Sequence, residues 1–93
     1  MWTVYEHRSL SKKLPKLPLE VLKRYEKWKD IITISGSEGL RLIKGFYDEP
    51  LKGEWAGYCS SRLGLQYRII YKTERDKLFV LVIDINPHLY RRK

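Results

Sequence analysis

The chain has 93 residues, of which 43% are hydrophobic, and this size fits one domain over residues 1–93 with a modest core. Its single cysteine, Cys59, excludes an internal disulfide, and the lack of a long apolar run or a signal-peptide pattern predicts a non-membrane protein in the reducing cytoplasm. The 19 Lys and Arg residues against 11 Asp and Glu residues give a net charge of +8, which favours nucleic acid as partner but also fits an ordinary basic protein.

The chain is expected to begin with a strand and a short helical turn. Residues 2–7 alternate bulky and polar side chains, as a short strand does. Residues 9–14 are compatible with one helical turn, which Pro15 closes.

One long amphipathic helix is predicted over residues 18–34. Pro18 suits the first helical position, and Gly36 suits the stop. The apolar stripe has spacings of four, three and four residues. It consists of Val21, Tyr25, Trp28 and Ile32.

A second, shorter helix is predicted over residues 38–44. Ser37 can cap it, while Leu40 and Ile43 are expected to face inward. Pro50 and two glycines then predict a loop over residues 45–53.

Three strands are predicted in the second half of the chain, over residues 55–63, 65–72 and 78–85. Residues 73–77 form a polar hairpin connection, and the last strand is apolar enough to be central with both faces covered. The order βααβββ predicts an α+β fold, with the N-terminal strand and the helices packed on a twisted antiparallel sheet. The uncovered sheet face is the expected place for a site.

The polar residues of the second half match the needs of metal-free RNA cleavage. The sequence has no zinc spacing, acidic metal cluster, phosphate-binding glycine loop or nucleophile elbow, so neither a metal nor a cofactor is expected. RNA cleavage needs a base for a 2′-hydroxyl, a phosphate clamp and an acid for the leaving oxygen. Glu49, Arg62, Arg68 and His88 offer these groups, and an antiparallel sheet can gather them.

Four segments between residues 49 and 90 resemble the RelE/ParE superfamily of toxins from bacterial toxin-antitoxin systems, in particular its YoeB and YafQ branches. The segments are Glu49–Lys52, Gly57–Leu63, Tyr67–Tyr71 and Asn86–Tyr90. The earlier half resembles the family only in element order and in the Lys-Leu-Pro entry to the long helix.

The resemblance implies a RelE-like fold and a metal-independent endoribonuclease. Such an mRNA interferase cuts the message in the ribosomal A site by 2′-hydroxyl attack, inhibits translation, and is neutralised by a cognate antitoxin. Carried over to this sequence, Glu49 is the general base, Arg68 the phosphate and transition-state clamp, and His88 the general acid. The RNA-binding roles fall to Lys52, Arg62 and Tyr90.

Two departures from the family shape this prediction. Cys59 and Ser61 stand where RelE has two working lysines, which favours chemistry by carboxylate and imidazole. Leu89 separates His88 from Tyr90, whereas in the YoeB branch the tyrosine follows the histidine directly.

Two other functions remain open. The same fold serves ParE-type inhibitors of DNA gyrase, for which a C-terminal histidine is unnecessary. A non-catalytic basic protein that binds RNA or the ribosome is the third possibility, and harmless overexpression would distinguish it from a toxin.

Overall fold

The computed structural model describes residues 1–64 and 66–87, so His88 and Tyr90 lie outside the described residues. Its first half contains one strand and three helices. These are β1 (Thr3–Glu6), α1 (Leu10–Lys13), α2 (Leu19–Ser35) and α3 (Ser37–Arg41), with a 3-10 turn over Leu14–Lys16 after α1. The long predicted helix is therefore confirmed to within one residue at each end.

The second half contains four strands joined by short turns. They are β2 (Glu49–Pro50), β3 (Cys59–Arg62), β4 (Tyr67–Glu74) and β5 (Phe79–Pro87). Three 3-10 turns lie between them or before them, over Lys44–Phe46, Gly53–Trp55 and Arg75–Lys77. The predicted loop over residues 45–53 thus contains a short edge strand, and the predicted strand over 55–63 starts four residues late because a 3-10 turn occupies its beginning.

The described strands form one sheet in the order β1-β5-β4-β3-β2. The pairs β5-β4, β4-β3 and β3-β2 are antiparallel, while β1 runs parallel to β5. The α+β class is confirmed, but the sheet is mixed rather than antiparallel. Strands β1 and β5 can run parallel because a long connection, which includes the helices, separates them in the chain.

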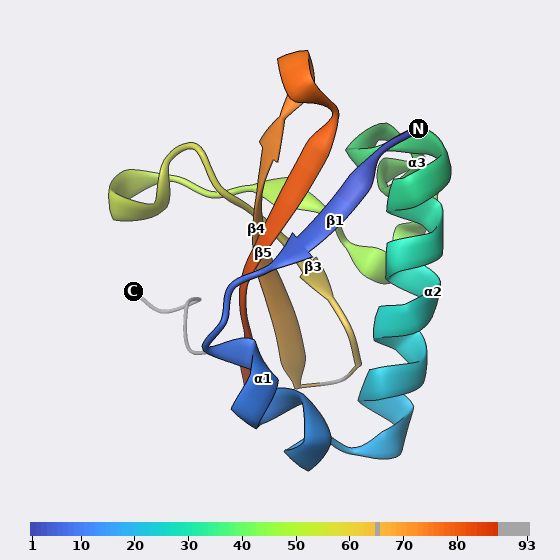
Figure 1. Ribbon diagram of the computed structural model, residues 1–93, viewed down its shortest axis with the longest axis vertical. Helices are drawn as coiled ribbons and strands as arrows, with labels where there is room; N and C mark the ends of the chain where they lie inside the picture. The colour runs from blue at the N-terminus through green and yellow to red at the C-terminus, as the bar shows by residue number, and fades with distance from the viewer. Residues whose placement is uncertain (65, 88–93) are drawn as a thin grey trace.

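Helices α2 and α3 lie on one side of the sheet, and the loop between β2 and β3 projects to the other side (Figure 1). The predicted stripe of α2 is fully confirmed as core, and it packs in one cluster with buried residues of β4 and β5. On β5 these are Val80, Val82 and Ile85, whereas Leu81 and Ile83 are only partly buried. The expectation that both faces of this strand are covered is therefore confirmed for the core face and only in part for the second face.

The entry to α3 also differs from the prediction. Gly36, not Ser37, is the N-cap residue, and a Cβ atom at Gly36 would lie 2.7 Å from the Trp2 ring. Its φ of 69° is a second reason for glycine. Ser37 is buried inside the helix, and Ile43, expected to face inward, is 38% exposed because α3 ends at Arg41.

Within residues 1–64 and 66–87, no helix has the length and apolar character needed to cross a membrane.

Candidate functional site on the open face of the sheet

The strand register places the predicted polar residues on the sheet face away from α2. Ile69 and Tyr71 of β4 pack in the core with the helix, so their neighbours Arg68 and Ile70 face the opposite side. Across the sheet, Arg62 pairs with Arg68, and Arg68 pairs with Asn86. The neighbouring row runs through Glu49, Ser60, Ile70 and Asp84. We call this surface the open face.

Arg68 is the centre of the open face. Its Nη2 donates a hydrogen bond of 2.5 Å to Ser60 Oγ and lies 3.3 Å from Glu49 Oε2. The arginine side chain is 13% exposed, whereas the glutamate side chain is 60% exposed. The guanidinium is therefore held in place, while the carboxylate remains accessible to a substrate.

The two other cations of the prediction lie at different distances from this centre. Arg62 is directly opposite Arg68, and its guanidinium stacks over the Tyr47 ring at 4.3 Å from the centroid. Lys52 is exposed just beyond β2, where it precedes the turn Gly53–Trp55. The structure thus groups Glu49, Arg62 and Arg68, and no direct contact brings Lys52 to them. The roles of His88 and Tyr90 stay predictions, since both fall outside the described residues.

On the opposite face, a buried carboxylate joins β3 and β4 to the segment that precedes β2. The Asp48 side chain is 0% exposed. Its Oδ1 accepts hydrogen bonds from Tyr71 OH and from Ser61 Oγ, the latter at 2.7 Å, and its Oδ2 lies 3.3 Å from Arg41 Nε. Ser61 Oγ in turn accepts a bond of 3.0 Å from Trp28 Nε1. We call this set the Asp48 network.

The Asp48 network changes the titration of its neighbours. Burial, and then the negative charge of Asp48, raise the pKa of Tyr71 far above its ordinary value. The pKa of the Cys59 thiol is raised by the same two causes, and a hydrogen bond to Asp48 raises the pKa of Arg41. These groups therefore keep their neutral tyrosine, neutral thiol and charged guanidinium forms over the physiological range.

Cys59 and Ser61 lie on the core face of the sheet, which corrects one interpretation of the sequence. Cys59 and Ser61 were compared with the working lysines of RelE, but Cys59 packs on the core and Ser61 belongs to the Asp48 network. Neither lies on the open face, so their identity says nothing about the chemistry beside Arg68. The residue that sequence reasoning missed there is Ser60, although strand alternation from Arg62 predicts its face.

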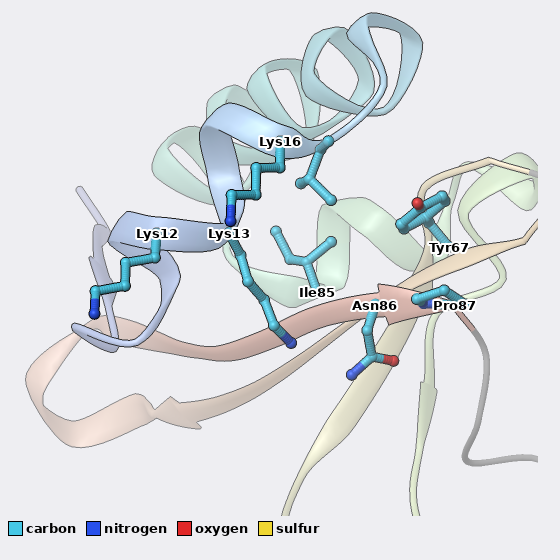
Figure 2. A pocket seen from close by; sticks show the side chains of 8 residues that line it. Lys12, Lys13, Lys16, Tyr67, Ile85, Asn86 and Pro87 are labelled. Carbon is cyan, nitrogen blue, oxygen red and sulfur yellow. The ribbon is translucent and has the colours of Figure 1, made fainter.

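A hollow of about 340 Å³ lies where α1 and the following turn meet the ends of β4 and β5 (Figure 2). Lys12, Lys13 and Lys16 line one side, and Asn86 connects the hollow to the open face. Lys13 Nζ extends toward β5, where it lies 2.5 Å from Asp84 Oδ1. The lysines favour an anionic group at this end of the sheet.

In the part of the chain that the structure describes, no group of three or more His, Cys, Asp or Glu side chains is placed to hold a metal ion.

The fold is similar to several solved toxin structures. The matched chain of the archaeal RelE-RelB complex from Pyrococcus horikoshii OT3 is 23% identical, with a TM-score of 0.75, and the match covers 96% of this chain and 97% of that chain. A chain of the YoeB-YefM complex from Staphylococcus aureus is 16% identical, with a TM-score of 0.71 and coverages of 95% and 98%. YafQ from E. coli strain BL21(DE3) is 17% identical, with a TM-score of 0.62 and coverages of 95% and 94%.

No protein-family model and no curated protein matches the sequence significantly. The structural matches confirm the RelE-like fold that the sequence resemblance implied.

Proposed function

We propose that this chain is a toxin of the RelE/ParE superfamily that cuts mRNA in the ribosome and so inhibits translation. The observation that carries the proposal is the pair Glu49 and Arg68 on the open face, with Ser60 holding the arginine and Arg62 directly opposite it. A carboxylate can act as the base for 2′-hydroxyl attack on a phosphodiester, and two guanidinium groups can bind the phosphate and stabilise its developing charge.

The existing contacts supply a route for the first step. A phosphate that binds Arg68 competes with Glu49 for the guanidinium, because both are anions. Glu49, released from the ion pair and 60% exposed, accepts the 2′-hydroxyl proton as the 2′-oxygen bonds to phosphorus. Arg68, with Arg62 beside it, neutralises the charge that develops on the phosphorane oxygens.

The second step breaks the bond between phosphorus and the 5′-oxygen. That oxygen needs a proton as it leaves, and we assign the proton to His88 on the basis of the sequence resemblance. The products are a 2′,3′-cyclic phosphate and a free 5′-hydroxyl, so no water and no redox partner enters this step. Lys52 and Tyr90 complete the proposal as further contacts to the message.

We also propose a cognate antitoxin as the protein partner, since the structures named above include toxin-antitoxin complexes of RelE and YoeB. A net charge of +8 favours a partner whose neutralising segment is acidic or amphipathic. Co-expression of the product of a neighbouring small gene is expected to restore growth and to form a complex with the toxin. A neighbour that neither binds nor rescues would contradict this pairing.

The activity is tested by adding the purified protein to ribosomes that translate a defined mRNA and mapping the cuts by primer extension. We expect cuts that require ribosomes and that disappear when Arg68→Ala and His88→Ala are combined. Unchanged cleavage by the double variant would rule out the assigned mechanism. Inhibition of gyrase supercoiling with translation unaffected would favour a ParE-type poison, and RNA binding without cleavage would favour a non-catalytic protein.

A further inference from the structure

Tyr47 lies beside the open face in a conformation that bulky residues rarely adopt. Its φ is 45° and its ψ is 50°, in the left-handed region. For a residue with a side chain this conformation costs roughly 1–2 kcal/mol. Such strain is often retained where function requires it. The side chain is 57% exposed, so burial of the ring in the core does not explain it.

The Tyr47 ring is covered on one side by Arg62. The guanidinium carbon lies 4.3 Å from the ring centroid, a cation-π distance. Because Tyr47 as a residue is still more than half exposed, a planar group can stack on the ring from the side opposite Arg62. The two residues form a flat, positively charged surface, which we call the Tyr47-Arg62 stack.

The charge around this stack is unbalanced. Arg62 and Arg68 are direct neighbours across β3 and β4, and like charges at such positions are destabilising. Glu49 lies within ion-pair distance of Arg68. Among the described residues, no carboxylate lies within ion-pair distance of Arg62. Arg62 therefore favours an added anion, and a phosphodiester brings a base with it.

We infer that the Tyr47-Arg62 stack binds an unpaired nucleobase of the nucleotide that adjoins the phosphate at Arg68. This inference rests on the proposed function and names its substrate class as single-stranded RNA with an unstacked base. The Tyr47 ring contacts the Arg62 guanidinium, and Arg62 pairs with Arg68 one strand spacing away, roughly 5 Å between the backbones, a reach that one nucleotide and its neighbouring phosphate can bridge. Aromatic stacking tolerates any base, because every base has a π-face.

Another exposed tyrosine provides a matched control. Tyr5 is 53% exposed and lies on the same sheet, but its ring packs edge-to-face against Phe79 with centroids 5.3 Å apart. It belongs to β1, which is separated from β3 by β5 and β4. A general loss of exposed aromatic surface would affect both tyrosines, whereas a base platform is specific to Tyr47.

The test measures binding of single-stranded 2′-deoxy trinucleotides to the full chain by fluorescence anisotropy at one salt concentration. These probes lack the attacking hydroxyl, so they are not cut. We expect Tyr47→Leu to weaken binding about tenfold, in line with the loss of one base stack. Tyr47→Phe keeps the ring and is expected to bind like the unmodified chain, as is Tyr5→Leu. Thermal unfolding of each variant is measured to check that the variant is folded.

A second set of trinucleotides carries one abasic position at each place in turn. For the unmodified chain, removal of the base at one of these positions is expected to lower the affinity about tenfold. For Tyr47→Leu, removal of the same base is expected to leave the affinity unchanged. Equal weakening of intact and abasic probes by Tyr47→Leu would overturn the inference, as would failure of the unmodified chain to bind the intact probe.

The outcomes for the two proposals are separable. Base-dependent binding through Tyr47 in a protein that leaves translated mRNA intact would keep the platform and reject the nuclease. Cleavage of translated mRNA by a protein whose binding ignores the abasic position would keep the nuclease and reject the platform.

Discussion

Asp48 and Glu49 are consecutive carboxylates whose side chains lie on opposite faces of one sheet. The Asp48 side chain is wholly buried and accepts hydrogen bonds from Tyr71, Ser61 and Arg41. Glu49 is 60% exposed and lies 3.3 Å from the Arg68 guanidinium. A carboxylate without access to solvent can organise a fold, but only an exposed one can meet a substrate. The difference assigns stability to the Asp48 network and chemistry to the open face.

The largest expected effect is the loss of stability on replacing Asp48, the buried carboxylate. Asp48→Ala leaves the Tyr71 hydroxyl and Ser61 without their acceptor inside the protein, and we expect the free energy of unfolding to fall by about 3 kcal/mol. Urea denaturation at pH 7 measures this change. The exposed Asp30 offers the matched control, since Asp30→Ala is expected to change stability by no more than about 0.5 kcal/mol. A loss below about 1 kcal/mol for Asp48→Ala would contradict the structural role.

The neighbouring carboxylate is expected to respond in the opposite way. Glu49→Gln removes the proposed base, so cleavage of translated mRNA should slow by on the order of 100-fold. Stability should change by less than about 1 kcal/mol, because a largely exposed ion pair contributes little. Glu54 is an exposed glutamate in the turn that follows β2, and Glu54→Gln should leave the rate unchanged. Equal rates for the two variants would remove Glu49 from the mechanism.

Alkaline pH tests the Asp48 network more finely. An unfolded tyrosine ionises around its ordinary pKa of 10.0, whereas burial and Asp48 keep the pKa of folded Tyr71 well above that value. The unfolded chain then holds fewer protons, so this stabilisation is complete below pH 10 and is lost as the pH rises. The loss approaches about 1.4 kcal/mol per pH unit for each such tyrosine.

Replacing the tyrosine should therefore flatten the pH profile. Tyr71→Phe is expected to reduce the slope of unfolding free energy between about pH 10 and 12 by nearly this amount. Tyr25→Phe should reduce the same slope further, because burial, and then a hydrogen bond to Glu6, also raise the pKa of Tyr25. Parallel profiles for Tyr71→Phe and the unmodified chain would refute the network's effect on Tyr71.

Much of the fold was predictable because it depends on local periodicity. The spacing of Val21, Tyr25, Trp28 and Ile32 fixed the buried face of α2, and alternation in β4 placed Arg68 opposite the core. The edge strand β2 was not predictable in this way. It has two residues, one of them Pro50, and it exists through its pairing with β3 rather than through its own strand propensity.

The candidate site also contains some residues that local patterns predict and others that only tertiary contacts explain. The closeness of Glu49 and Arg68 was expected from the sequence resemblance and an antiparallel sheet, and Ser60 follows from alternation once Arg62 is placed. The burial of Asp48 had no local signal, because its partners come from two distant strands and a helix. Tyr47 was missed for a similar reason, since its left-handed backbone and its contact with Arg62 depend on tertiary structure.

The separation of chemistry from stability is tested most directly by Arg68→Ala, with cleavage rate and unfolding free energy measured on the same preparation. We expect this variant to cut a translated mRNA about 100-fold more slowly, because the phosphate clamp is lost. We expect the free energy of unfolding to fall by about 1–2 kcal/mol, less than for Asp48→Ala, because the largely buried Arg68 side chain loses its hydrogen bond to Ser60. Cleavage at the rate of the unmodified chain, or destabilisation as large as that of Asp48→Ala, would contradict this separation.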